Sequence, residues 1–555
     1  MEDAEEKYRN LLAKQSTSLS AAVDEYKKRY KRDPPRGFDS WWSFSQENNV
    51  KLVDEYDLLM EDMEPFWSLS GEELRRRALQ VAQLPSIHLV RINAGKAEDA
   101  DIEKLSKDTE HGHRSKGFRR LLQKFVHKLP DMDLPINGKA EGRILIPWEH
   151  QNYPNITQHN TSESLVGANI SPDWQGQGSV WEAFRRTCPP GSSSRRLYSS
   201  YRNPLSEASK VLIGAGPSAG DDFKFSETLD ADFDFCQYPW AHYSQGHFFS
   251  DWRTIPALYP VFSPAKARGF SDIKIPSHYY HGQNKRYTYG WEADDLEPKE
   301  VDDMEVPWEE KSDAIFWRGA TTGGGSTPSG FAPSYQRHRF LRMANENNNA
   351  NRTIVHADHS AGTKYVSTTV PAGKLNQDIM DVAFVSAVGD YPGGEEALRK
   401  DHRFGDAVPL GKHWAYKYLV DLDGMSYSGR FMAFMASDSA VLKATVYEEY
   451  FSDWLQPWLH YIPLSSSYTE IYNIHAYFSG PSKSTLGAAN LTSSYDTTKP
   501  RSNEGDKQLR RIARAGKQWR KTVGRTVDME AYVYRLCLEY ARLVADDRDS
   551  MNFTF

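Results

Sequence analysis

Cysteine and long apolar runs are both scarce in this sequence of 555 residues. Three cysteines are present, Cys188, Cys236 and Cys537, and no CxxC pair occurs. Three thiols are too few for a disulfide scaffold or a cysteine-based zinc site. Because Cys537 lies in a periodic helical pattern, we expect a buried thiol there. Cys188 and Cys236 are then the only plausible pair, and their pairing stays open. The absence of an apolar run of about 18 residues excludes a membrane span.

An excess of positive charge is also absent. Lys and Arg total 68 and Asp and Glu total 75, which gives a net charge of −7. Proteins that bind nucleic acid usually carry a basic excess on the binding face, so we expect no nucleic-acid partner. The first residues, MEDAEEKYRN, lack the features of a signal peptide. Either the protein is cytosolic or it has lost an N-terminal membrane anchor.

Several catalytic motifs are missing as well. The absence of a Walker phosphate-loop pattern excludes a P-loop ATPase, and the 17 histidines form no HExxH pattern. Asp232-Phe-Asp234 has the form of the DxD motif that holds Mn²⁺ and a nucleotide in some transferases. Such a tripeptide is common by chance, so no metal is assigned. We expect four histidines to be hydrogen-bonded structural groups or substrate contacts rather than metal ligands: His242, His247, His278 and His338.

Aromatic residues are plentiful and make up 13% of the chain. Aromatic faces can stack on the C–H groups of sugars, so the composition gives modest support to a function that involves carbohydrate. Composition alone favours the alternative, that these side chains fill cores and domain interfaces.

Residues 1–110 are predicted to form a charged, helical N-terminal extension. Ser70 and Glu73 form a capping box that begins a helix reaching Val81. Residues 87–92 are predicted to form a short strand or extended segment.

Two further segments lie on either side of residues 301–500. Residues 111–300 are predicted to be an irregular α/β domain, with an amphipathic helix over 117–129. Residues 501–555 contain the clearest helical pattern, over 527–546, which predicts a C-terminal helix that packs against the core and carries no chemistry.

Residues 301–500 show a repeated unit of strand, glycine turn and helix. Ala314–Trp317 is predicted to be a buried strand that leads through a glycine-rich turn to a helix near 335–341. Tyr418–Leu422 is a second such strand, and the helix after it should start near Ser428. This unit is typical of a parallel α/β sheet.

The first candidate site is the glycine-rich turn from Trp317 to Gly325. Glycines let the backbone approach a phosphate closely, and free N–H groups at a turn bind anions. Arg337, in the helix that follows, could add a bidentate contact. The alternative is a flexible surface loop with exposed arginines.

The second candidate site is the segment from Asp421 to Arg430. Ser426 and Ser428 can cap the helix that follows, which would put Arg430 in its first turn. A cation there is unfavourable against the helix dipole unless an anion lies between them, and this favours a diphosphate site. The alternative is an ion pair between Arg430 and Asp421 or Asp423.

The third candidate is a set of carboxylates over 130–133 and 140–149. Transfer of a sugar to a hydroxyl group needs a general base. Glu141, flanked by Gly142 and Arg143, could serve. The alternative is an ordinary solvated carboxylate.

Several segments together resemble glycosyltransferase family 90. This family contains fungal capsule-associated β-xylosyltransferases and animal Rumi-type protein O-glucosyltransferases, and the fungal branch is the more similar. The most specific segment runs from Glu449 to Pro463. The other matching segments follow in the expected order: LPDMDL at 129–134, CPPGS at 188–192, DIKIPS at 272–277, IFWRG at 315–319, YKYL at 416–419, SYSGRF at 426–431 and LCLEYAR at 536–542.

The resemblance implies a GT-B-like α/β fold. An acceptor domain at 111–300 and a nucleotide-sugar domain at 301–500, both Rossmann-like, should face a cleft. A UDP-sugar donor, inversion at the anomeric carbon and no cofactor are implied, and we expect no need for a metal. Arg337 and Arg430 should bind the nucleotide phosphates, and Glu449 should hold the ribose. The other residues expected at the donor are Arg318, Gly319, Thr321, Thr322, Ser426, Tyr427, Ser428 and Gly429. The residues expected at the acceptor are Asp234, Ser277, Tyr279 and Tyr280.

One departure from the family pattern concerns the catalytic base. Many relatives carry Asp-Glu-Pro-Arg or Asp-Tyr-Pro after the LPDMD segment, and that Asp resembles their base. Here the position is Ala140. We expect Glu141, one residue along, to take the role; otherwise the base comes from elsewhere or the chain is impaired.

The resemblance favours transfer of xylose from UDP-xylose to a mannose-containing glycan or polysaccharide, with a β linkage. UDP-glucose is the second donor. An inactive relative that binds UDP or glycan, and a structural subunit of a polysaccharide-synthesising complex, are the alternatives. The implied location is the Golgi lumen, in a type II membrane protein whose anchor is absent from this chain. Six sequons permit a secretory location: Asn155, Asn160, Asn169, Asn351, Asn490 and Asn552.

Overall fold

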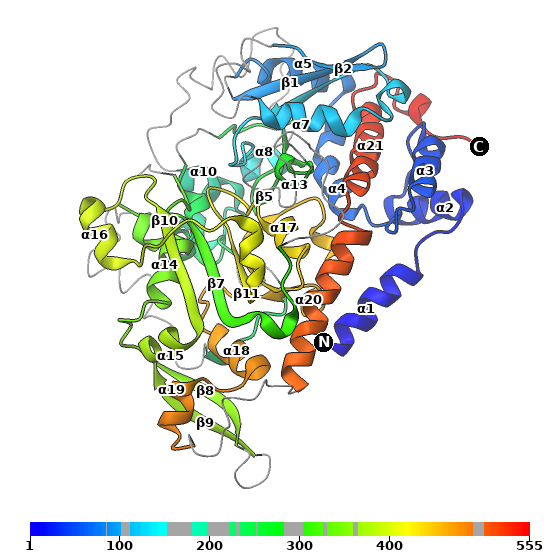
Figure 1. Cartoon of the computed structure of the whole chain (residues 1–555). Helices are drawn as coiled ribbons and strands as arrows, with labels where there is room; N and C mark the ends of the chain where they lie inside the picture. Colours follow the sequence, from blue (N-terminus) through cyan, green and yellow to red (C-terminus); the bar gives the residue numbers. More distant parts are fainter. Residues whose placement is uncertain are drawn as a thin grey trace.

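Two five-stranded sheets organise the chain (Figure 1). The computed structural model describes residues 1–84, 86–101, 112–152, 180–196, 222–228, 234–250, 254–281, 304–325, 330–358, 364–491 and 504–555. Over these ranges the chain is a mixed α/β protein, as the sequence predicts. The GT-B arrangement of two Rossmann-like domains around a cleft stays a prediction.

The first sheet has the order β2 (Lys96–Asp99), β1 (Ile87–Asn93), β3 (Met132–Asn137), β4 (Phe262–Ser263) and β6 (Ile273–Lys274). β1 is antiparallel to both β2 and β3, whereas β3, β4 and β6 are parallel. The strand predicted over 87–92 is therefore confirmed. Because Ile87, Val90 and Ile92 are buried in this sheet, residues 1–110 complete it and are not solely a helical extension.

The second sheet is entirely parallel over its described strands. Its order is β10 (Met380–Ser386), β7 (Ser312–Ala320), β11 (Tyr416–Leu422), β12 (Ala440–Ala444) and β14 (Ile462–Pro463). β11 and β12 are buried along nearly their whole length, which fits strands covered on both faces. The helix after β7 is α14 (Gln336–Met343). The strand, turn and helix predicted here are confirmed.

The C-terminal helix α21 (Thr526–Leu543) lies against three helices from the first part of the chain: α3 (Phe38–Glu47), α4 (Asp57–Met63) and α7 (His113–Leu122) (Figure 1). The Trp41 indole on α3 donates to the carbonyl oxygen of Ala531 at 3.0 Å. α21 is almost completely buried, because charged side chains among its apolar residues pair with each other: Arg535 and Arg542 both contact Glu539. The helix therefore packs against the N-terminal part of the chain.

Two helices test the local predictions. α5 (Gly71–Val81) begins where the capping box predicts, with Ser70 Oγ accepting from the Glu73 N–H at 3.2 Å. The helix predicted over 117–129 is wrong at both ends. α7 starts at His113 and ends at Leu122, and a 3₁₀ turn over Val126–Lys128 follows, because the chain reverses there to enter β3.

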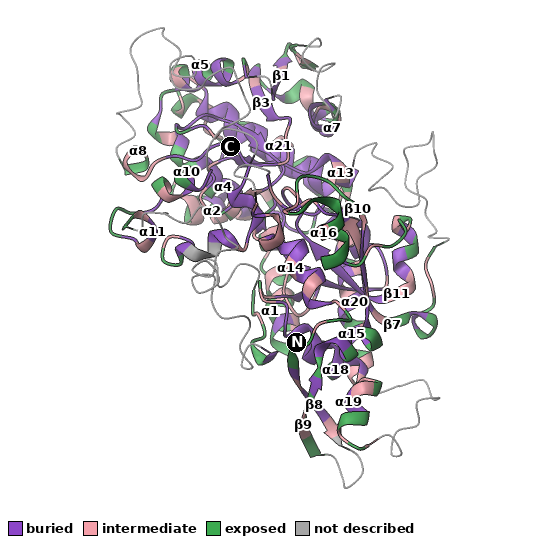
Figure 2. Ribbon diagram, turned by 90° about the vertical axis from the view of Figure 1, so that its left-hand side faces the viewer, coloured by how far each residue is buried: buried purple, intermediate pink, exposed green. Residues whose placement is uncertain are grey.

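The remaining elements lie at the periphery. β8 (Asn351–Asp358) and β9 (Lys364–Pro371) form an antiparallel ribbon at one end of the molecule (Figure 1). Figure 2 shows α16 (Gly394–Asp401) and α19 (Lys483–Ala488) on the exposed surface. Within the described residues, no helix combines the length and the apolar character that crossing a membrane would require.

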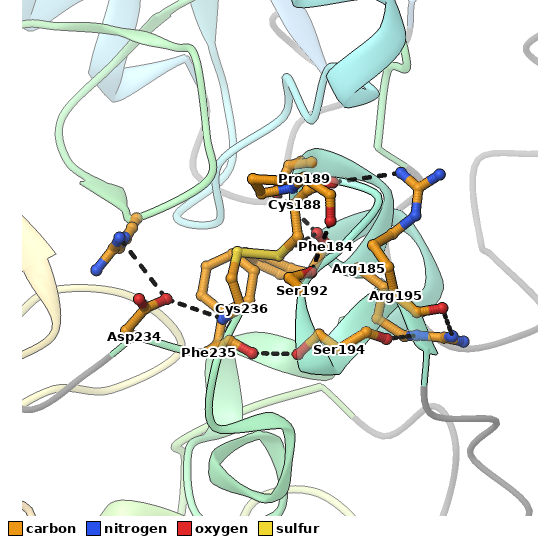
Figure 3. Close-up of a disulfide and its surroundings, with 12 residues drawn as sticks. Phe184, Arg185, Cys188, Pro189, Ser192, Ser194, Arg195, Asp234, Phe235 and Cys236 are labelled. Atoms are coloured by element: carbon orange, nitrogen blue, oxygen red, sulfur yellow. Dashed lines mark hydrogen bonds and ion pairs between the residues drawn. A yellow bond between two sulfur atoms is a disulfide. The ribbon is translucent and has the colours of Figure 1, made fainter.

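Cys188 and Cys236 form a disulfide in the first half of the molecule (Figure 3). Cys188 directly follows α10 (Val180–Thr187), and the two Cα atoms are 5.5 Å apart. Ser194 also contacts the segment that contains Cys236. Its N–H donates to the Cys236 carbonyl at 2.9 Å, and its hydroxyl donates to the Phe235 carbonyl. Cys537 is a buried free thiol, as expected.

Candidate active site

The carboxyl ends of the parallel strands in the two sheets meet. The residues predicted to bind the donor lie at the end of β7, in the loops after β7, β11 and β12, and on α14. Glu141 follows β3, and Ser277–Tyr280 follow β6. Two hydrogen bonds from backbone N–H groups join the two halves of the site. Gly246 N–H donates to Gln336 Oε1 at 3.0 Å, and Gly325 N–H donates to the Phe249 carbonyl at 2.8 Å. Ligands of parallel α/β sheets bind at this edge.

Side chains predicted for the acceptor contact side chains predicted for the donor. The Tyr280 hydroxyl donates to Glu449 Oε1 at 2.6 Å and lies 3.1 Å from the carbonyl oxygen of Ser428. Ser277 Oγ and the Tyr427 hydroxyl are 2.5 Å apart. A two-stranded sheet of β5 (Lys266–Ala267) and β13 (Tyr447–Glu448) also crosses this junction. Five predicted residues thus come together from two distant parts of the sequence.

Arg337 lies in the first turn of α14 and is buried. Its guanidinium group donates to the Ala320 carbonyl at 3.0 Å, the Asp423 carbonyl at 2.8 Å and Thr322 Oγ1 at 2.6 Å. One side chain therefore joins the loops after β7 and β11. The alternative of a flexible loop with exposed arginines does not fit this side chain.

Arg430 is also buried, and its guanidinium group donates to the carbonyl oxygen of Arg318 at 2.5 Å. The helix expected to start near Ser428 is α17 (Phe431–Met435), which is short and begins later, so Arg430 is its N-cap residue. No side chain caps it, and the expectation that Ser426 or Ser428 would do so is wrong. The backbone of 426–430 remains a buried loop, because Tyr427 points to Ser277 in the other half of the molecule.

The carboxylates considered as partners of Arg430 have other contacts. Asp421 forms a buried ion pair with Lys443 at 2.8 Å. Asp423 accepts from Thr445 Oγ1 at 2.5 Å and from the Val446 N–H at 2.9 Å. Burial raises the pKa of Asp423 to about 7.

Glu449 belongs to the same buried polar cluster. Its carboxylate lies 4.0 Å from Lys443 and accepts from Tyr280. Burial raises the pKa of Glu449 to about 8, against the opposing effects of Lys443 and the Tyr280 hydrogen bond. Three carboxyl groups around one lysine favour a neutral, protonated Glu449 near pH 7.

Three residues predicted to bind the donor, at the end of β7 and just after it, contact other parts of the protein: Arg318, Gly319 and Thr321. The Arg318 side chain forms an ion pair with Asp381 at 2.7 Å, so only its backbone carbonyl reaches Arg430. Thr321 Oγ1 accepts from the Val388 N–H at 2.7 Å, which ties the turn to the loop after β10. Gly319 lies beneath the Trp317 ring, where a Cβ atom would be 2.6 Å from the ring.

Glu141 follows β3 and is buried. Its loop is held by two polar side chains: Asn137 donates to the Glu141 carbonyl at 2.7 Å, and Asp272 accepts from the Arg143 and Ile144 N–H groups at 3.0 and 2.9 Å. Burial raises the pKa of Tyr447 in β13, and Asp423 and Glu141 add to that rise. Glu141 therefore interacts electrostatically with Tyr447 of β13, the strand that pairs with β5.

Asp234 lies beside the disulfide (Figure 3). Its carboxylate accepts from the Cys236 N–H at 3.0 Å and lies 3.7 Å from Arg268. Its contact with an acceptor stays a prediction. Tyr279 is half-buried, and its N–H donates to Ser277 Oγ at 3.2 Å.

Metal ligands are not evident in the described part of the chain, where no group of three His, Cys, Asp or Glu side chains could hold an ion. Asp232 lies outside the described residues. The histidines are packed groups: His242 stacks on Trp181, and burial lowers its pKa to about 4. Burial likewise lowers the pKa of His247 to about 3.

Two residues that organise the site were not predicted from the sequence. Gln336 donates to the Gly323 carbonyl at 2.8 Å and the Gly424 carbonyl at 3.1 Å, besides accepting from Gly246. Lys443 is a fully buried lysine in β12. A lysine inside an apolar strand was the available signal for the second, whereas no local pattern marks Gln336.

Known proteins share segments of this chain. A family model described as Glycosyl transferase family 90 matches residues 369–479, which include the loop 426–430 and Glu449. Protein O-glucosyltransferase 2 of Danio rerio is 28% identical over 142 residues, or 24% of each chain. O-glucosyltransferase rumi of Drosophila melanogaster is 24% identical over 234 residues, or 40% of this chain and 45% of the relative.

The similarity to a third relative has the same extent. Protein O-glucosyltransferase 3 of Rattus norvegicus is 28% identical over 145 residues, or 26% of this chain and 24% of the relative. The chain thus spans a quarter to less than half of the length of these curated relatives. The chain is thus similar to glycosyltransferase family 90 over residues 369–479, and parts of it are similar to curated O-glucosyltransferases.

Proposed function

We propose that the chain is an inverting, UDP-sugar-dependent glycosyltransferase whose donor binds at the carboxyl edge of the second sheet. One observation carries the proposal: Arg337 and Arg430, from different elements, both donate to backbone carbonyls at the end of β7. Two buried guanidinium groups at one strand end suit a diphosphate, which Arg can bind through two parallel hydrogen bonds.

The proposed reaction is a single in-line displacement. Glu141 takes the proton of an acceptor hydroxyl group, whose oxygen forms a bond to C1 of the donor sugar. The bond from C1 to the diphosphate breaks on the opposite face, and its electron pair leaves with UDP. Arg337 and Arg430 stabilise the charge that develops on the diphosphate. No metal is required in this scheme.

The donor sugar has two candidates. The fungal motifs favour UDP-xylose, with a mannose-containing glycan or polysaccharide as acceptor and a β linkage as product. The names of the relatives, which are O-glucosyltransferases, favour UDP-glucose and give it comparable support. The two sugars differ by one CH₂OH group, so a few side chains around C5 decide between them.

We place the protein in the secretory pathway, with the Golgi lumen and a type II anchor as the finer expectation. The disulfide between Cys188 and Cys236 supports an oxidising compartment, because such bonds are rare in the cytosol. The six sequons also permit a location in the secretory pathway.

Release of UDP from a panel of UDP-sugars tests the function, with and without mannose oligosaccharides, in EDTA and in Mn²⁺. Acceptor-stimulated release from one donor in EDTA would establish a metal-independent transferase and identify its sugar. UDP binding without turnover would favour an inactive relative with Ala140 as the cause. A chain that binds no nucleotide would favour a structural subunit.

A further inference from the structure

Two arginines and one tryptophan form a compact cluster at the end of β7. The guanidinium carbons of Arg337 and Arg430 each lie 5.4 Å from the centre of the Trp317 ring. Both distances are within the range of a cation–π interaction. Trp317 is fully buried, so its ring interacts with the two cations in a site shielded from solvent.

The backbone of β7 completes this cluster. Arg430 donates to the carbonyl oxygen of Arg318, and Arg337 donates to that of Ala320. Gly319, between these two residues, has no side chain, and any Cβ atom there would be 2.6 Å from the Trp317 ring. The Trp-Arg-Gly sequence therefore has a steric reason: the glycine leaves the space that the ring occupies.

Like charges repel, and the repulsion grows where water is excluded. Two guanidinium groups in one buried site repel each other, and this repulsion opposes the hydrogen bonds that join them to the backbone of β7. The π face of an indole attracts a cation, and Trp has the strongest such face among the aromatic side chains. A single ring in contact with both cations can keep them at the same strand end before any anion arrives.

We infer that Trp317 is the positioning residue of the diphosphate site: its ring holds Arg337 and Arg430 in the geometry that binds the donor diphosphate. The inference rests on the proposed function, because it takes UDP as the ligand. Trp317 itself touches neither the sugar nor the diphosphate in this account. Its substitution should therefore weaken binding of the charged part of the ligand only.

The test compares UDP with uridine, which lacks the diphosphate, on folded protein. Trp317→Leu removes the π face and should weaken UDP binding about tenfold, while uridine binding stays within about twofold. Trp317→Phe keeps an aromatic face and should restore UDP affinity to within about threefold of the wild type. The dissociation constants come from titration calorimetry for UDP and from competition for uridine.

Trp41→Leu is the matched control, because Trp41 is another buried tryptophan with an arginine, Arg535, over its ring at 4.8 Å. It should lower thermal stability without changing UDP affinity. Unchanged UDP binding in Trp317→Leu, or an equal loss of UDP and uridine binding, would overturn the inference. If wild-type protein binds no UDP, or Arg430→Ala binds it normally, the proposed function itself fails.

Discussion

Buried polar side chains, rather than surface charges, set the chemistry of the junction between the two sheets. Asp421, Asp423 and Glu449 surround Lys443, and all four are buried. Burial disfavours the charged form and raises the pKa of Asp423 to about 7 and that of Glu449 to about 8. Neighbouring carboxylates add to the rise, and Lys443 opposes it.

Glu449→Gln tests this charge balance through pH. A folded-state pKa near 8 exceeds the ordinary value of 4.5, so between these pH values the native protein holds a proton that the unfolded chain has released. The free energy of unfolding should therefore fall as pH rises from about 4.5 to 8, and Glu449→Gln should make this fall smaller, leaving the part due to Asp423. Urea titrations at pH 5, 7 and 8.5 measure it, with Glu395→Gln on exposed α16 as the control. Parallel pH profiles for wild type and variant would show that Glu449 is ionised.

Glu141→Gln tests the base. Loss of a general base should lower kcat about 10²- to 10⁴-fold and leave the KM for the donor nearly unchanged. Glu149→Gln is the control, since Glu149 is a nearby carboxylate that pairs with Arg195 at 2.7 Å on the surface. Near-normal turnover in Glu141→Gln would mean that the base lies elsewhere.

At the scale of elements, closely packed loops join the two sheets at the carboxyl ends of their parallel strands. Gly246, in a 3₁₀ turn, approaches the backbone of Gly323 so closely that a Cβ atom would lie 1.5 Å from its carbonyl oxygen. A rigid backbone on both sides leaves no room for a side chain. This glycine is therefore one of the close contacts on which the junction depends.

Gly246→Ala should separate the loops and destabilise the protein by roughly 1–3 kcal/mol, the usual cost of overpacking. UDP binding should weaken as well, because Gln336 loses the Gly246 N–H. Gly487→Ala on α19 is the matched control: nothing lies within 4 Å of its Cβ position, so stability should stay or rise slightly. Chemical denaturation measures both, and equal stabilities would contradict the packing described here.

Elements with a strong local pattern were predictable from sequence, and those set by distant contacts were not. The strands β7 and β11 and the helix α5 follow from apolar runs and a capping box. α17 does not, because the loop 426–430 is held by Tyr427 and Ser277 across the junction. The meeting of Ser277, Tyr280 and Glu449 likewise depends on the packing of two sheets, although the family resemblance identified each residue. The contact of Asp234 with the Cys236 N–H beside the disulfide was not predicted either, because the pairing of Cys188 with Cys236 stayed open at the level of sequence.

For the whole molecule, the disulfide and the sequons test the compartment. Cys188→Ala should cost roughly 2–4 kcal/mol, as loss of a bridge over 48 residues would. Reducing agent should destabilise wild-type protein by a similar amount and leave the variant unchanged. A reduced pair in protein from its natural source would contradict the secretory assignment.

Glycan attachment is the second test at this scale. Asn351 and Asn490 are exposed, whereas Asn552 is half-buried and its side-chain oxygen accepts from Arg542 at 3.3 Å. Protein made in the secretory pathway should carry N-glycans at Asn351 and Asn490 and none at Asn552, as peptide mass spectrometry after glycosidase treatment would show. Thr353→Ser, which keeps the Asn351 sequon, and Thr353→Ala, which removes it, form the control pair.

In the proposed mechanism Arg430 stabilises a departing UDP. Acceptor-stimulated UDP release by wild type, Arg430→Lys and Arg430→Ala with the best donor tests this role most directly. Loss of a group that stabilises developing charge should lower kcat/KM about 10²- to 10³-fold in Arg430→Ala. Arg430→Lys should fall between, because it keeps the charge and loses the paired hydrogen bonds. Near-normal release by Arg430→Ala would contradict the diphosphate site and the mechanism built on it.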